Sequence, residues 1–147
     1  MGDLVTRLQE QGVLDGQTAD AVRSASASGV PIDEALITKA DLPEERVLRF
    51  MAEEFAVPCV DVESRLPSRE FLAPFPARIL LQRKLLPLAE ENGAVLVAAS
   101  RLFDTSGIDE LRVTTGRQFR VVLAPSSAIE RALRRLLGVG ADTVQSM

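Results

Sequence analysis

The first third of the chain spaces its apolar residues as a helix does. Near the N-terminus, Leu4, Val5 and Leu8 recur at intervals that place them on one helix face. Breaks that contain glycine, proline or polar residues divide this stretch and predict four short helices. The breaks lie at residues 11–12, 29–31 and 40–43. Pro43 and the two glutamates after it suit a first helical turn, so the last helix is predicted over 43–55.

After Pro58 the pattern changes to the alternation of β-strands, interrupted by helical stretches. Strands are predicted at 59–62, 85–91, 94–100 and 118–124, and helices at 76–84, 106–115 and 127–138. The last helix is expected to begin with a capping box of Ser127 and Glu130. The pair Asn92-Gly93 predicts a tight hairpin between the two central strands. Because Pro87 lacks an N–H group, its strand either begins there or lies at a sheet edge.

These elements predict an α+β protein in two parts with a short tail. A small helical subdomain occupies residues 1–56, and a small, mostly antiparallel sheet covered by helices occupies residues 57–138. Residues 139–147 lose their periodicity and predict a linker. The helical part contains two similar helix-turn-helix phrases, GVLDGQTADAV and ADLPEERVLRFMA, although unrelated amphipathic hairpins can share this much similarity.

Composition narrows the possible chemistry. The chain has 147 residues, 46% of them hydrophobic, which suffices for one ordinary core or two small ones. Cys59 is the single cysteine and histidine is absent, so an internal disulfide, a zinc site and a Cys/His nucleophile are excluded. No apolar run reaches the length of a membrane span, and we expect a cytoplasmic protein without metal, cofactor or membrane insertion.

The net charge of −4 disfavours nucleic acid as a partner, since that partner requires a basic surface. A DNA-binding helix-turn-helix is the alternative for the helical part. Its second helices carry at least as many acids as bases and only one amide, Gln17, so base readout is poorly served. Adjacent carboxylates such as Glu53-Glu54 do not converge on one site, and no phosphate-binding loop of the form GxxxxGK[ST] is present. We therefore expect no catalytic residues.

Four motifs carry a family resemblance: AEEFAVPCVD at 52–61, LPL at 86–88, VLVAAS at 95–100 and IDELRVTTG at 108–116. In this order and spacing the chain resembles the N-terminal domain of the assembly ATPases of bacterial type II secretion and type IV pili, the general secretory pathway protein E family. The resemblance implies a docking and regulatory domain whose hexameric motor lies downstream. The implied partner is the cytoplasmic domain of an inner-membrane platform protein, which would hold the chain at that membrane.

Some relatives of this family bind cyclic di-GMP through a phrase beginning R-L-G, and a sensor of that nucleotide is the competing interpretation. The corresponding residues here are Asp3, Leu4 and Val5 in the first copy and Pro31, Ile32 and Asp33 in the second. An anionic ligand would therefore meet acids where it needs a cation, and we expect no useful binding. A fragment of an enzyme whose chemistry lies elsewhere is a third interpretation.

A docking domain needs charges around an apolar centre. The helix over 43–55 offers Arg46, Arg49, Phe50 and Glu53 at helical spacing, and these residues are the candidate partner-binding site. An ordinary solvated helix explains the same residues equally well. The next candidate is the arginine-rich last helix, with Arg131, Arg134 and Arg135.

Overall fold

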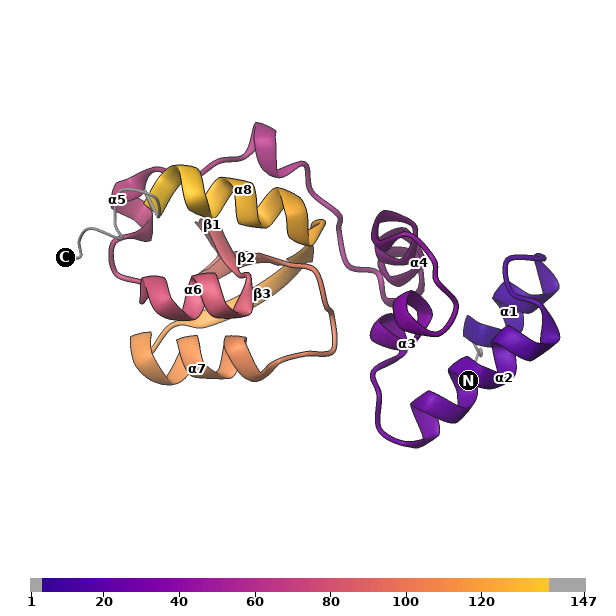
Figure 1. The fold of residues 1–147 in the computed structure, drawn as a ribbon. Helices are drawn as coiled ribbons and strands as arrows, with labels where there is room; N and C mark the ends of the chain where they lie inside the picture. Colours follow the sequence, from indigo (N-terminus) through magenta and orange to yellow (C-terminus); the bar gives the residue numbers. More distant parts are fainter. Residues whose placement is uncertain (1–3, 138–147) are drawn as a thin grey trace. The chain divides into compact units, whose positions relative to one another are not determined.

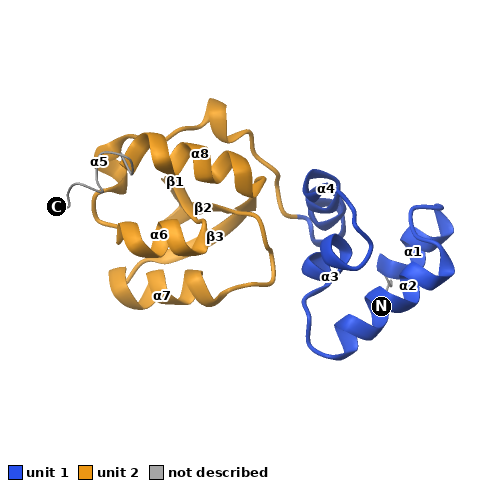
Figure 2. Ribbon diagram, viewed as in Figure 1, with its two compact units in different colours: residues 1–56 blue, residues 57–147 orange. Residues whose placement is uncertain are grey.

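The computed structural model describes residues 4–137, and the chain divides into two compact units (Figure 2). Residues 1–56 form the helical unit and residues 57–147 form the α/β unit. Each unit has buried apolar residues of its own. The linker predicted over 139–147 lies outside the described residues.

Residues 4–56 of the helical unit form four helices, as the spacing of its apolar residues predicted. They are α1 (Leu4–Glu10), α2 (Gly16–Ala27), α3 (Ile32–Thr38) and α4 (Glu44–Phe55), shown in indigo to purple in Figure 1. Asp15 caps α2, because its carboxylate accepts the Thr18 N–H at 2.7 Å. Pro43 precedes the first turn of α4, and Ala56 ends that helix in the left-handed conformation.

The two helix-turn-helix phrases correspond to two helix pairs of the same dimensions. Helices α1 and α3 each have 7 residues, and α2 and α4 each have 12. Equivalent positions also share burial, since Leu8 matches Leu36 and Ala19 matches Val47, all fully buried. The sequence repeat is therefore accompanied by a repeat of local structure.

The α/β unit contains five helical segments and three strands within the described residues. In chain order they are the 3₁₀ turn η1 (Val62–Ser64), α5 (Arg69–Leu72), α6 (Ala77–Arg83), β1 (Leu86–Glu91), β2 (Ala94–Ala99), α7 (Ser106–Thr115), β3 (Gln118–Leu123) and α8 (Ser126–Leu137). The α+β class is confirmed. The short helix α5 was not predicted, and its start is fixed by the Ser68 hydroxyl, which accepts the Phe71 N–H at 3.0 Å.

The sheet has the order β1-β2-β3 and is mixed rather than mostly antiparallel. Strands β1 and β2 form the predicted hairpin, in which Asn92 and Gly93 both have positive φ, 52° and 81°. Strands β2 and β3 are parallel. Helix α7 lies between them in the chain and carries the chain back to the end of the sheet at which β2 began, so that β3 runs in the same direction. The alternation of apolar and polar residues predicts a strand but not its direction. For this reason the sequence did not reveal that β3 is parallel to β2.

The two outer strands of the sheet, β1 and β3, test the predictions made for Pro87 and for residues 59–62. Pro87 lies in the edge strand β1, beside a bulge between Pro87 and Ala89, so the edge-strand alternative is correct. The strand predicted over 59–62 is wrong. Cys59 makes only an isolated parallel bridge to Leu123, and the chain then turns into η1, where the Asp61 carboxylate accepts the Glu63 N–H at 3.1 Å.

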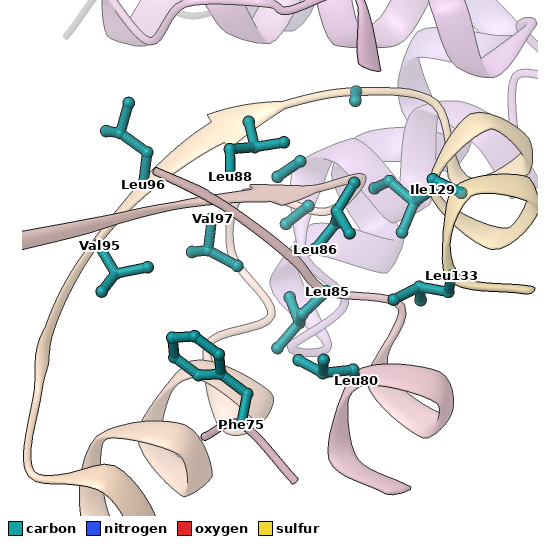
Figure 3. Close-up of a cluster of buried hydrophobic side chains, with 14 of the residues drawn as sticks. Phe75, Leu80, Leu85, Leu86, Leu88, Val95, Leu96, Val97, Ile129 and Leu133 are labelled. Atoms are coloured by element: carbon teal, nitrogen blue, oxygen red, sulfur yellow. The ribbon is translucent and has the colours of Figure 1, made fainter. Parts of the chain in front are cut away.

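The core of the α/β unit lies between the sheet and a layer of helices, in which α6 lies between α7 and α8 (Figure 1). In Figure 3, Val95 and Val97 point from β2 to the same side as Phe75, whereas Leu96 points to the opposite side. Val95 and Val97 are completely buried, and Ala99 is 4% exposed, so this side of β2 forms the buried centre of the unit. No helix in the described range 4–137 is long and apolar enough to span a bilayer.

The ends of the last two long helices were predicted with different success. Helix α7 ends at Gly116, whose φ of 69° is the left-handed conformation expected there. Helix α8 begins at Ser126, so Ser127 lies inside the helix and the predicted capping box is wrong. The Glu130 carboxylate instead contacts the Lys84 Nζ atom at 3.2 Å, and this tertiary partner is invisible to a local pattern.

Candidate functional site

Helix α4 presents its candidate residues on one side and its core residues on the other. Val47, Leu48 and Met51 are buried, and this apolar stripe is the reason that the segment folds as an amphipathic helix. The side chains predicted to bind a partner occupy the spacing i, i+3, i+4 and i+7 on the opposite side. We call Arg46, Arg49, Phe50 and Glu53 together the α4 surface.

The α4 surface combines one half-buried ring with three exposed charges. The Arg46 guanidinium carbon lies 5.7 Å from the centre of the Phe50 ring, a distance that allows a cation–π contact. Among the described residues no ion pair engages Arg49 or Glu53. The structure thus brings the four predicted residues together and leaves two charges available to an external partner.

A neighbouring charge of the same helix is already used inside the unit. Glu54 pairs with Arg7 of α1, and this contact ties α4 to the first helix of the unit. Glu54 is thus engaged inside the unit, whereas the adjacent Glu53 is exposed. Neither the Arg7–Glu54 contact nor the stacking of Arg46 on Phe50 was predicted, although the separation of four residues between Arg46 and Phe50 was a usable signal.

The second candidate surface lies on α8 in the α/β unit. Arg131, Arg134 and Arg135 are exposed, while Ile129 and Leu133 of the same helix are buried in the core. Arg135 is partly engaged, since its guanidinium lies 3.7 Å from the Glu63 carboxylate. Its backbone carbonyl also accepts a hydrogen bond from Arg69 at 3.1 Å. The α8 surface, defined by these three arginines, is therefore purely cationic and lacks an aromatic centre.

The residues that correspond to the nucleotide-binding phrase are largely buried. Leu4 and Val5 are 6% and 3% exposed, and Asp3 lies outside the described residues. In the second copy Asp33 is 1% exposed, and its carboxylate accepts the Glu34 N–H at 2.8 Å. A buried acid thus occupies the position of the glycine in the phrase.

The other adjacent carboxylates of the chain, Glu90-Glu91 and Asp109-Glu110, are engaged in ion pairs. Within the described part of the chain, no group of three His, Cys, Asp or Glu side chains could hold a metal ion. The pairs are Glu90 with Arg117 at 2.7 Å, Glu91 with Arg65 at 3.8 Å, Asp109 with Arg112 at 3.0 Å and Glu110 with Arg83 at 2.9 Å. Of the acids, Asp15 has a perturbed pKa, which is lowered chiefly by the backbone hydrogen bond from Thr18.

The fold is that of an N-terminal domain of a secretion or pilus assembly ATPase. Comparison with known families agrees, because residues 55–143 match the MshEN domain. The chain belongs to the MshEN domain family. The match begins at the end of α4 and covers the described α/β unit, so the helical unit lies almost entirely outside it.

Individual relatives support the same class. The chain is 20% identical over 135 residues to the type IV pilus assembly ATPase PilB of Myxococcus xanthus (strain DK1622), a match that covers 92% of this chain and 24% of PilB. It thus spans about a quarter of that relative. The structure of MshE with cdg has a TM-score of 0.71 at 20% identity, covering 92% of this chain and 99% of the other.

The N-terminal domain of XpsE is also similar, in two crystal forms. The TM-scores are 0.59 and 0.63 at 23% and 26% identity, and 90% of this chain is covered in each comparison. The matches cover 93% and 92% of the two XpsE chains. The resemblance to N-terminal domains of assembly ATPases, inferred from four short motifs, is therefore confirmed.

Proposed function

We propose that this domain docks an assembly ATPase onto the cytoplasmic domain of an inner-membrane platform protein. The observation that carries the proposal is the α4 surface, in which the half-buried Phe50 is flanked by Arg49 and Glu53 without an internal ion pair among the described residues. Interfaces commonly place an aromatic anchor inside a rim of charges. Such a surface suits recognition and contributes no group for catalysis.

The same proposal includes the downstream motor and the location of the domain in the cell. The motor that hydrolyses ATP is supplied by domains downstream of this chain and works as a hexamer. The domain resides in the cytoplasm and reaches the inner membrane through its partner, without inserting into lipid or binding nucleic acid. Because α4 is tied to α1 by the Arg7–Glu54 pair, the helix presents its outer residues from a fixed support.

Charge reversal on α4 tests the docking proposal. Arg46→Glu with Arg49→Glu changes exposed side chains, so folding should be affected by no more than about 0.5 kcal/mol per site. Capture of the platform protein's cytoplasmic domain should fall strongly, and its dependence on salt should weaken. The matched comparison is Arg131→Glu with Arg134→Glu, which makes the same charge change on the α8 surface. Unchanged capture by the α4 variant and loss by the α8 variant would move the interface to α8.

Sensing of cyclic di-GMP is the second candidate function, favoured by the structural similarity to MshE with cdg. The residues of this chain argue against it, since Pro31 and the buried Asp33 stand where a cation and a glycine are required. We expect binding no tighter than millimolar, a free energy of roughly −4 kcal/mol. Titration calorimetry that gave micromolar affinity would establish the sensor instead.

A further inference from the structure

A cavity of about 230 Å³ lies where the parallel strands of the α/β unit end. Ala99 and Ser100 line it from the end of β2, and Ser126 lines it from the first turn of α8, which follows β3. Ligands of open α/β sheets bind outside the carboxyl ends of parallel strands, where the next helix begins. The cavity therefore has the position at which this kind of sheet usually holds a ligand.

Cationic side chains from two separate segments line this cavity. Arg83 and Lys84 come from the end of α6, and Arg101 comes from the loop between β2 and α7. The one acid in the lining is Asp104, whose carboxylate accepts the Ser106 hydroxyl at 2.9 Å and the Ser106 N–H at 3.4 Å. Three cations against one carboxylate give the lining itself a net positive charge, which favours an anion.

Two of these cations are neutralised by exposed carboxylates. The Arg83 Nε atom lies 2.9 Å from Glu110, and the Lys84 Nζ atom lies 3.2 Å from Glu130. All four side chains are about 40% exposed, between 39% and 45%. Exposed pairs of this kind contribute about 0–1 kcal/mol, so a doubly charged anion can replace the carboxylates as the partner of these cations.

Close packing holds part of the cavity wall in place. A Cβ atom on Gly107 would lie 2.8 Å from the Cβ and Cγ atoms of Arg83, so α7 packs directly on the stem of that side chain. Arg101 donates to the Ser100 carbonyl at 2.8 Å, and Ser100 is 8% exposed. The first turn of α8 adds backbone N–H groups and the positive end of a helix of 12 residues.

We propose that this cavity binds a phosphate group, with Lys84 and Arg101 as its cationic contacts and the first turn of α8 as a source of N–H donors. The site is independent of docking through α4. Glu130 acts as a competing anion: it pairs with Lys84 when the ligand is absent and releases Lys84 when the ligand binds. The same chemistry is offered by free phosphate and by the phosphates of a nucleotide.

Amide NMR of the chain at constant ionic strength tests the proposal, with inorganic phosphate, ATP and cyclic di-GMP as separate probes and chloride as the reference anion. We expect at least one of the phosphate probes to move the amides of Ser100, Arg101 and Ser126. A response to phosphate alone identifies the free anion, and a response confined to ATP or cyclic di-GMP identifies a phosphate ester. No response of these amides to any of the three probes would overturn the proposal.

Three variants distinguish binding of phosphate in the cavity from a general effect of the protein's charge on anion binding. Lys84→Gln with Arg101→Gln should weaken binding about tenfold or more, since charge-assisted contacts are lost. Glu130→Gln should tighten binding, because it removes the anion that competes for Lys84. Arg78→Gln is the control for loss of an exposed arginine on α6. Equal affinities in Glu130→Gln and the wild type, or equal losses in Arg78→Gln and the double variant, would contradict the site.

Capture of the platform domain is measured on the same variants. The double variant at Lys84 and Arg101 should retain capture, because the α4 surface lies in the other unit. Loss of phosphate binding with intact capture supports the cavity as a separate site. Intact phosphate binding in the α4 charge-reversal variant, together with lost capture, shows that the two functions fail separately.

Discussion

Val97→Asp is the sharpest test of the structure, because it puts a carboxyl group into the centre of the α/β core. Val97 is completely buried in the central strand, between Pro87 on β1 and Val121 on β3. Loss of the buried valine side chain costs about 1.5–3 kcal/mol. Keeping the new carboxyl neutral at pH 7, roughly three units above its ordinary pKa, costs ~4 kcal/mol more.

The summed cost, about 5–7 kcal/mol, is comparable to the whole stability of the unit. At 0.05–0.15 kcal/mol per residue, a unit covering residues 57–147 has a free energy of unfolding of roughly 5–14 kcal/mol. We therefore expect the variant to lose most of its α/β unit at 37 °C. The helical unit has its own core and should keep its amide dispersion, so the loss is confined to one set of signals.

Thermal unfolding followed by circular dichroism and amide NMR checks this expectation. Val113→Asp is the matched control, because Val113 is 86% exposed on α7 and the same change there should cost no more than about 0.5 kcal/mol. The effect at Val97 has a definite pH dependence. Since burial raises the pKa of the new carboxyl in the folded state, the penalty applies above its unfolded pKa and shrinks as the pH falls towards about 4. A wild-type Tm in Val97→Asp would refute the assigned face and register of β2.

Three further predictions concern catalysis, packing and pH. The isolated chain should release no phosphate from ATP, and turnover that survives further purification would contradict its non-catalytic role. Gly107→Ala should lower the Tm of the α/β unit by several degrees and perturb the Arg83 signals, because its Cβ would lie 2.8 Å from Arg83 and Leu85. Asp15 has a lowered pKa, so its contribution to α2 is complete above pH 3.8 and is lost as the pH falls through the folded pKa. Amide NMR between pH 2 and 5 should show the Thr18 signal moving with the Asp15 carboxyl, and no such coupling should remain in Asp15→Ala.

The sequence predicted the elements that rest on local signals. The four N-terminal helices follow from the apolar spacing, and the hairpin follows from Asn92-Gly93, whose positive φ values suit a two-residue turn. It failed where a distant contact decides the outcome. The direction of β3 depends on where α7 delivers the chain, and Cys59 meets one residue of β3 rather than pairing as a strand.

Of the two candidate sites, the α4 surface was predictable from the sequence and the cavity of the α/β unit was not. The α4 surface lies on one helix, so its spacing alone identified Arg46, Arg49, Phe50 and Glu53 as neighbours. The phosphate cavity draws on residues around Lys84, Ser100 and Ser126, which are far apart in the sequence and meet only at the ends of the strands. No local motif marks that convergence, so the sequence analysis did not find it.

The two helix pairs of the helical unit match, so each pair can serve as a reference for substitutions made in the other. Each position in α1 has a counterpart in α3, so an exchange of counterparts changes a side chain to one that the same backbone already accepts elsewhere. Four of the seven exchanges, such as Leu4 with Ile32, conserve polarity, and three do not. Among those three, Val5 is the position at which both counterparts are buried, because its counterpart is the buried Asp33. Val5→Asp and Asp33→Val together would transfer this buried acid from the second pair to the first, and would show which pair depends on it.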